Sequence, residues 1–372
     1  APQGRQRFNR GARSEEGRVE LLLDGNEVLL AERYQVKLGT FTQPCAFSLT
    51  LGTGMTLPEQ IRKTPPNTLF ELRLNGALMM MGAIDGHASS GPSGTLIVQG
   101  RDALAQLHDA AMLQERSYKD STYVSLVRSV LDSVGLEDAE LFVSNDDNRK
   151  RLVGRSSGAK ATRAIEQIQI SDSEAAGGAI KKHVQSQLGE KAYEFLRRHL
   201  DRAGLFLWAT ADGNFVLSEP NPNQAPLYRL QRSHGAATEY SVIVDHSYQN
   251  DTVGRFSEIH VYTRGETKRA GRSSSVAVVR DSEMEAWGFS RPTTLRDVNA
   301  DSLKKAEFMG RKKMAESRRQ GFKLSYTVAG HETGSTLGGT VRWAPDTLVE
   351  VNDPRLDIEE EVFWIEAVTF NG

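Results

Sequence analysis

The sequence predicts a protein of the α+β class that is mainly β, in which two barrel-like antiparallel β domains flank an α/β domain. Three observations support this prediction. Apolar and polar residues alternate with a period of two in the first hundred residues and again after residue 239. Between these stretches the apolar residues follow the period of an amphipathic helix. Turn signals such as Asn75-Gly76 separate the predicted strands.

The first β domain is predicted over residues 18–108. Its clearest part is a hairpin, in which Phe70, Leu72 and Leu74 alternate with polar residues before the turn at Asn75-Gly76. This dipeptide favours a type I′ turn because both positions require positive φ. The predicted strands of this domain cover residues 19–23, 27–30, 34–38, 46–51, 69–74, 77–85 and 95–99.

The α/β domain is predicted over residues 109–228. Its first helix has Asp120 or Ser121 as the N-cap and Gly135 just after its end. A second helix is predicted over residues 190–203, followed by Gly204 and a hairpin over residues 205–218. The first helix presents one apolar face, made of Tyr123, Val127, Val130, Leu131 and Val134.

An insertion near residues 155–190 interrupts this domain. It is rich in Ser, Ala and Gly, and two amphipathic helices are expected at 164–170 and 175–184. The domain ends in a proline-rich segment at residues 219–226, which indicates a linker or a turn.

The second β domain is predicted over residues 229–372, with a helix inserted near residues 299–319. The final strand, at residues 361–370, is apolar on both faces and is therefore expected to be buried on both sides. The other predicted strands of this domain are 240–244, 258–262, 322–328, 339–343 and 347–351.

The composition is that of an ordinary globular protein. The 372 residues are 38% hydrophobic and 25% charged, and the net charge of −2 gives no overall attraction to nucleic acid or to anionic membranes. No apolar run approaches the roughly 18 residues of a membrane-spanning helix. Cys45 is the only cysteine, which excludes an intramolecular disulfide and fits assembly in a reducing cytoplasm. The arm at residues 1–17 carries four arginines and is expected to be flexible, or ordered only by a neighbour.

Four blocks of the sequence, taken in order, resemble the tail baseplate hub proteins of contractile-tailed phages, the Mu-type hub or late control protein D family. The blocks are residues 65–112, residues 121–136, residues 191–221, and residues 239–264 with a later stretch at 342–370. None of them is a short diagnostic motif. The resemblance depends on four weak matches that occur in one order.

The resemblance implies a structural protein with two tube-like barrel domains per subunit. Three subunits would form a pseudo-sixfold ring that adapts the hexameric tail tube to the trimeric central spike. The implied partners are two further copies of the chain, the spike protein, the tail tube protein and other baseplate proteins. The implied location is the baseplate of the virion tail, after assembly in the host cytoplasm. The arm 1–17 and the insertion 155–190 depart from the family pattern and are expected to contact neighbouring proteins.

Two alternatives to a phage hub stay open. One is the corresponding hub of a tailocin or another contractile injection system, which gene neighbourhood would separate from a phage. The other is a tail enzyme that degrades cell wall, because two carboxylates for glycoside hydrolysis can come from distant positions. Nothing in the sequence favours the enzyme.

No catalytic, cofactor or metal site is predicted. Gly52-Thr53-Gly54 lacks the rest of a dinucleotide fingerprint, and Ser157–Lys160 and Ser302–Lys305 match S-x-x-K in letters only. Neither Asp146-Asp147 nor Asp353–Asp357 has the spacing of a calcium loop. Met79-Met80-Met81 is interpreted as packing. The eight histidines, none in a metal-ligand spacing, are His87, His108, His183, His199, His234, His246, His260 and His331.

Two charged segments are the remaining candidates. The helix near 299–319 carries many basic residues outside its apolar stripe, which would suit an acidic partner, although a solvated face is the simpler interpretation. Specific nucleic-acid binding is not predicted, because no aromatic residues are interleaved with the charges. Glu359-Glu360-Glu361 opens the final strand and is interpreted as a charged edge that blocks unwanted pairing. The basic residues of the helix are Lys304, Lys305, Arg311, Lys312, Lys313, Arg318 and Arg319.

Overall fold

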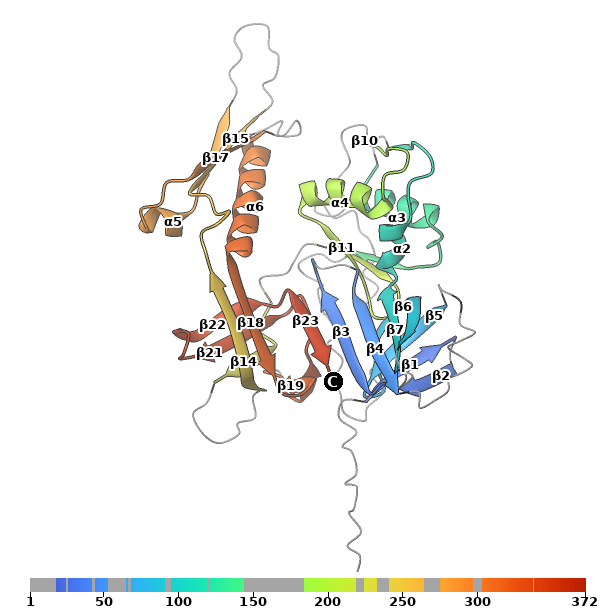
Figure 1. Ribbon diagram of the computed structural model, residues 1–372. Helices are drawn as coiled ribbons and strands as arrows, with labels where there is room; N and C mark the ends of the chain where they lie inside the picture. Colours follow the sequence, from blue (N-terminus) through green and yellow to red (C-terminus); the bar gives the residue numbers. More distant parts are fainter. Residues whose placement is uncertain are drawn as a thin grey trace, which may run out of the picture. The chain divides into compact units, whose positions relative to one another are not determined.

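The protein forms two compact units, which are described separately (Figure 1). Unit 1 comprises Ala1–Val242 and Ala329–Gly372, and unit 2 comprises Ile243–Val328. The structure is a computed structural model, and both units are mainly β, as predicted. It describes residues 18–24, 26–41, 44–52, 65, 68–90, 95–118, 121–143, 184–218, 224–232, 241–263, 275–296, 303–336 and 338–372.

The largest element of unit 1 is an eight-stranded sheet in which all neighbouring strands are antiparallel. The strand order is β2-β1-β5-β6-β7-β4-β3-β23, so β2 and β23 are the two edges. The seven strands expected before residue 103 are confirmed. The strands are β1 (Val19–Leu23), β2 (Asn26–Leu30), β3 (Arg33–Gly39), β4 (Ala46–Gly52), β5 (Leu69–Leu74), β6 (Ala77–Ser90), β7 (Thr95–Asp102) and β23 (Ala367–Asn371).

The hairpin between β5 and β6 has the predicted turn. Asn75 and Gly76 have φ angles of 52° and 75°, as a type I′ turn requires. Phe70, Leu72 and Leu74 are all buried, and the residues between them are partly exposed. The alternation of the sequence therefore reports the core face of the sheet correctly.

The sheet is completed by the end of the chain, which the sequence did not predict. β23 pairs along its length with β3, and the backbone N–H of Tyr34 donates to the carbonyl of Gly372 at 2.7 Å. The prediction placed this segment in a separate C-terminal domain. Two complete barrels stay a prediction, because the described strands form an open sheet.

The expected single strand over residues 361–370 is wrong. Two strands occupy this region, β22 (Ile358–Trp364) and β23, and the chain leaves one sheet at Ile365 to join the other. Most of their residues are partly or fully exposed, and half of the Val362 side chain is accessible. The apolar residues on both faces of this segment therefore do not predict that it is buried within one chain.

The α/β part of unit 1 confirms both predicted helices. α3 (Tyr123–Ser133) begins at Thr122, which forms a capping box with Ser125, so the expected N-cap at Asp120 or Ser121 is wrong. α4 (Ala192–Ala203) ends at Gly204 with φ of 73°, as expected. The remaining elements are α2 (Leu104–Asp109), β8 (Ser117–Tyr118), β9 (Leu141–Val143), β10 (Val184–Gln185), β11 (Phe206–Ala209) and β12 (Phe215–Ser218).

These elements surround one apolar core. Leu126, Val130, Phe195 and Leu196 from the two longer helices are fully buried, and Phe215 from the confirmed hairpin packs in the same cluster. The rest of unit 1 contains β19 (Glu332–Gly334), β20 (Thr340–Arg342) and the parallel pair β13 (Tyr228–Gln231) and β21 (Leu348–Asp353), with β22 antiparallel to β21.

Unit 2 combines a two-stranded ribbon with a three-stranded sheet covered by a helix. The ribbon joins β14 (Ser241–Asn250) to β18 (Phe322–Val328). The sheet has the order β16-β15-β17, with bounds Val276–Arg280, Glu258–Tyr262 and Pro292–Arg296. The helix is α6 (Leu303–Gly321), which confirms the predicted helix, and a short helix α5 (Ser282–Ala286) follows β16. The sequence analysis did not predict β16, α5 or β17.

Candidate interaction surfaces

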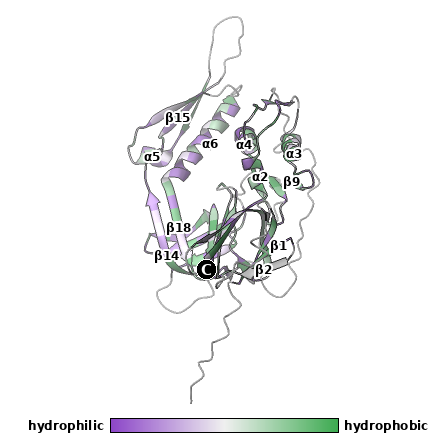
Figure 2. Ribbon diagram, turned by 45° about the vertical axis from the view of Figure 1, so that its right-hand side comes forward, coloured by the Kyte–Doolittle hydropathy of each residue, from purple (hydrophilic) through white to green (hydrophobic). Residues whose placement is uncertain are grey.

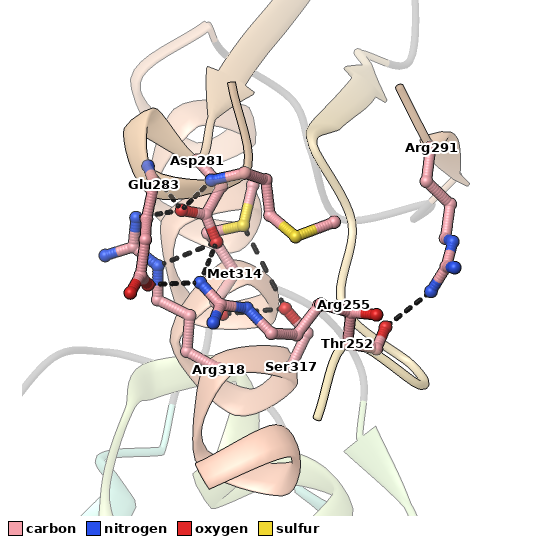
Figure 3. A network of polar contacts seen from close by, with 9 residues as sticks. Thr252, Arg255, Asp281, Glu283, Arg291, Met314, Ser317 and Arg318 are labelled. Atoms are coloured by element: carbon pink, nitrogen blue, oxygen red, sulfur yellow. Dashed lines mark hydrogen bonds and ion pairs between the residues drawn. The ribbon is translucent and has the colours of Figure 1, made fainter. Parts of the chain in front are cut away.

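A buried ion-pair network centred on Asp281 fixes the position of α6 in unit 2 (Figure 3). The Asp281 carboxylate is fully buried and accepts hydrogen bonds from Arg255 at 2.9 Å and from Arg318 at 2.6 and 2.9 Å. It also caps α5 by accepting from the backbone N–H of Glu283 and of Met284. One side chain therefore joins the 252–255 turn, α5 and the last turn of α6.

The network holds the Asp281 carboxylate in its charged form. Burial by itself would raise the pKa of Asp281, but hydrogen bonds from Arg318 and Arg255 outweigh it and hold the pKa well below its usual value. Arg255 also donates to Glu283 at 2.6 Å and lies over the ring of Trp287, 5.1 Å from its centroid. This site was not predicted from the sequence. A signal was present, because an Asp directly before a short segment rich in Glu is the pattern of a helix N-terminus.

The inner face of α6 packs closely on the three-stranded sheet. Ala306 and Met314 are buried in the cluster that also contains Ile259 and Val261. Gly310 lies between them, and a Cβ atom there would approach Val279 to 2.7 Å, so the helix can contact the sheet only because this residue is glycine. The expected apolar stripe of α6 is confirmed at Ala306, Met309, Gly310 and Met314, which contact the sheet. Its first residue, Leu303, is instead 53% exposed.

The outer face of α6 is basic, and the expectation that no aromatic residue lies among its charges is wrong, because Phe308 is at its centre. Phe308 is 46% exposed, and Lys304, Lys305, Arg311 and Lys312 are its neighbours at positions i−4, i−3, i+3 and i+4. Figure 2 shows hydrophilic and hydrophobic residues following one another along the helix. Arg311 pairs with Glu307 at 2.5 Å. The term basic face is used below for these four cations and Phe308.

The second charged surface lies on β22 in unit 1. Glu359, Glu360, Glu361 and Val362 are four consecutive exposed residues, although a regular strand would turn alternate side chains to opposite faces. The pairing with β21 shifts between Val351 and Asp353, and Glu360 has a φ of 52°, so the strand bulges here. In the described residues β22 pairs only with β21, which leaves its other edge open. The term acidic edge is used below for these four residues.

Asp353, the first residue of the Asp353–Asp357 segment that was considered as a calcium loop, has a structural role at the end of β21. Asp353 is fully buried, and Arg232 donates to its carboxylate at 2.7 Å. Met79 and Met80 are buried, which supports the packing interpretation.

Cys45 directly precedes β4. Burial raises the pKa of its thiol, and its backbone N–H donates to Asp102 at 3.1 Å.

The described histidines take part in local packing rather than in a common cluster. The His108 ring stacks on Tyr193, with 4.0 Å between centroids, and His199 packs edge-on against Phe195. His260 contacts Glu258 at 2.9 Å within β15. The His246 ring lies near Tyr326, and the His331 ring packs against Tyr34 and Phe370. His87 lies on β6.

Several predicted segments lie outside the described residues. These are the arm 1–17, most of the insertion 155–190 with its two expected helices, Asp146-Asp147, Ser157–Lys160, Thr53-Gly54, Ser302, His183 and His234. Among the residues that the structure does describe, no three His, Cys, Asp or Glu side chains are grouped to hold a metal ion. In the same residues, no helix is long and apolar enough to span a bilayer.

Comparison with known proteins identifies the class of fold. No protein-family model and no curated protein matches the chain. Three solved structures that match it over nearly its whole length are tail proteins, two of them from prophages, so the chain has the fold of these tail proteins.

Three of these structures illustrate the similarity. A 43 kDa tail protein of prophage MuSo2 from Shewanella oneidensis is 18% identical, with a TM-score of 0.71 over 95% of this chain and 94% of that one. A tail protein from Neisseria meningitidis MC58 is 22% identical, with a TM-score of 0.70 over 96% and 92%. The prophage tail protein gp18 from Listeria monocytogenes is 10% identical, with a TM-score of 0.54 over 95% and 90%.

Proposed function

We propose that this chain is a structural hub protein of a contractile phage tail. The observation that carries the proposal is the shared fold over at least 95% of the chain with tail proteins of the MuSo2 prophage and of Neisseria meningitidis. The order of the four sequence blocks supports the same family. The charged surfaces of α6 and β22 suit a protein whose work is to contact other proteins, rather than to catalyse a reaction.

In this proposal three copies form a ring that joins the hexameric tail tube to the trimeric central spike. Each copy would supply two tube-like domains, so that three chains present six similar surfaces to the tube. Among the described strands, β2 and β23 are the edges of the eight-stranded sheet, and they support such a ring because unpaired strand edges favour pairing with another chain. Permanent interfaces of this kind bury roughly 2,000 Å² or more.

The first experiment is to measure the molar mass of the purified protein by light scattering coupled to size exclusion. The protein is measured alone and with the spike protein encoded beside it. We expect a trimer, or a trimer that forms only with the spike. A stable monomer under both conditions would contradict the hub, and assays of cell-wall cleavage would then test the enzyme alternative.

A further inference from the structure

We propose that the basic face of α6 in one copy binds the acidic edge of β22 in the next copy, and that this contact joins the copies of the ring. The inference rests on the proposed trimer and names the surfaces that would hold it together. In a single chain each surface carries one exposed apolar side chain beside exposed or partly exposed charged residues. These are basic on α6, where Arg311 pairs with the neighbouring Glu307, and acidic on β22.

The two surfaces are complementary in charge. The basic face carries four cations, with Glu307 as its neighbouring acidic residue, whereas β22 carries three glutamates and no basic residue. The excess of each sign is local, because the whole chain has a net charge of only −2. Complementary charged surfaces steer association and fix the relative orientation of two proteins.

Each surface also has one exposed apolar side chain that could pack against the other. Phe308 is 46% exposed at the centre of the basic face, and Val362 is 50% exposed at the end of the acidic edge. Exposed charge pairs by themselves contribute little affinity, so burial of these two side chains would supply the central contact. The charged residues would form the rim around it.

Both surfaces are held rigidly, which lowers the entropic cost of binding. The Asp281 network and the close approach at Gly310 fix α6 on its sheet. On β22 the bulge at Glu360 interrupts the regular alternation, and all four residues of the acidic edge are exposed on this edge strand.

A contact between two different surfaces of identical chains is heterologous, and repetition of such a contact closes a ring or extends a filament. A ring of three copies would contain three identical contacts of this kind. Each copy would offer its basic face to one neighbour and its acidic edge to the other.

The experiment reverses the charge of each surface. One variant carries Lys304→Glu, Lys305→Glu and Lys312→Glu, a second carries Glu359→Lys, Glu360→Lys and Glu361→Lys, and a third combines all six. The third variant keeps the net charge of the natural chain. Molar mass is measured across protein concentration, together with circular dichroism to establish folding. A matched control carries Glu137→Lys, Asp138→Lys and Glu140→Lys, which reverses three exposed charges elsewhere in unit 1.

We expect each single-surface variant to weaken self-association by about tenfold to a hundredfold, because three favourable charge contacts become repulsive. We expect the combined variant and the matched control to associate as the natural chain does. If the natural chain is a trimer and both single-surface variants remain equally stable trimers, this contact is wrong, while the proposed hub function stands. If the natural chain is a monomer alone and with the spike, the proposed function itself fails.

The same experiment tests the simpler interpretation of the acidic edge. If the glutamates serve only to prevent pairing of β22 with other strands, lysines at these positions would prevent it equally well. The second variant would then keep the association of the natural chain, and the proposal would be overturned.

Discussion

At the scale of single residues, Asp281 is the polar residue on which unit 2 depends most. It accepts hydrogen bonds from two arginines and two backbone N–H groups, and neither Asp281 nor Arg255 is accessible to solvent by more than 3%. A buried ion pair is costly to break, because the remaining partner keeps its charge without compensation.

Asp281→Asn should lower the free energy of unfolding of unit 2 by about 3 kcal/mol, since it leaves Arg255 buried without its main counter-charge. The contribution of Asp281 should also depend on pH. Its pKa is lowered by folding, so its stabilisation is complete above the unfolded pKa of about 3.9 and is lost as the pH falls below that value. Urea unfolding at pH 7 and pH 3 measures both effects. Glu285→Gln, at an exposed ion pair, is the control and should change the stability by less than about 0.5 kcal/mol.

Asp102 should have the opposite pH dependence. It is buried, and burial raises its pKa to about 6 despite hydrogen bonds from the backbone N–H groups of Cys45 and Leu104. The folded protein therefore binds this proton more tightly than the unfolded chain. The stability contributed by Asp102 should rise as the pH falls from about 6 to about 4, by on the order of 3 kcal/mol.

The Asp102 effect can be isolated by comparison with Asp102→Asn, which does not titrate. The difference in unfolding free energy between the natural chain and the variant should shift in favour of the natural chain between pH 7 and pH 4.5. A difference that stays constant over this range would show that the carboxyl group does not titrate there. The carbon-13 chemical shift of the Asp102 carboxyl group would give the pKa directly.

At the scale of elements, the sequence predicted best where local rules and packing agree. The β5–β6 hairpin has both a turn that Asn-Gly satisfies well and an alternation that the core requires. α4 was predicted with its glycine cap for the same reason. The elements β16, α5 and β17 were missed because each has only five residues and they depend on tertiary contacts such as the Asp281 network.

The Asn75-Gly76 turn offers a clean test of backbone strain. Gly76 has a φ of 75°, and a Cβ atom there would meet no atom within 4 Å, so only the backbone conformation opposes a side chain. Gly76→Ala should therefore cost about 1–2 kcal/mol of stability. Gly86→Ala is the matched control, because a Cβ there also meets nothing within 4 Å and its φ is not in the left-handed region. Equal effects of the two substitutions in denaturant unfolding would contradict the strain argument.

At the scale of the whole molecule, the sequence did not reveal which distant segments share a sheet. Nothing in residues 367–371 indicates pairing with residues 35–39, because strand pairing over such a separation is set by the complete core and not by local pattern. The exposure of Val362 in the acidic edge was also not predicted from the sequence. Its apolar neighbours predicted burial, but Val362 is 50% exposed in the single chain.

The division into two units predicts two steps in unfolding. In the described residues, the core cluster of unit 2 contains five buried side chains, whereas the α/β part of unit 1 alone contains nineteen. Since stability grows with the buried apolar surface, unit 2 should open at lower denaturant than unit 1. Amide hydrogen exchange at increasing urea should show residues 243–328 losing protection first.

Two substitutions separate this prediction from a single cooperative transition. Asp281→Asn should speed exchange in unit 2 and leave the protection of unit 1 unchanged. Phe70→Ala, which removes a fully buried ring from the eight-stranded sheet, should lower the stability of unit 1 by about 3–5 kcal/mol. If each substitution destabilises both units equally, the units fold as one, and the ring contacts proposed for α6 and β22 would then depend on the stability of the entire chain.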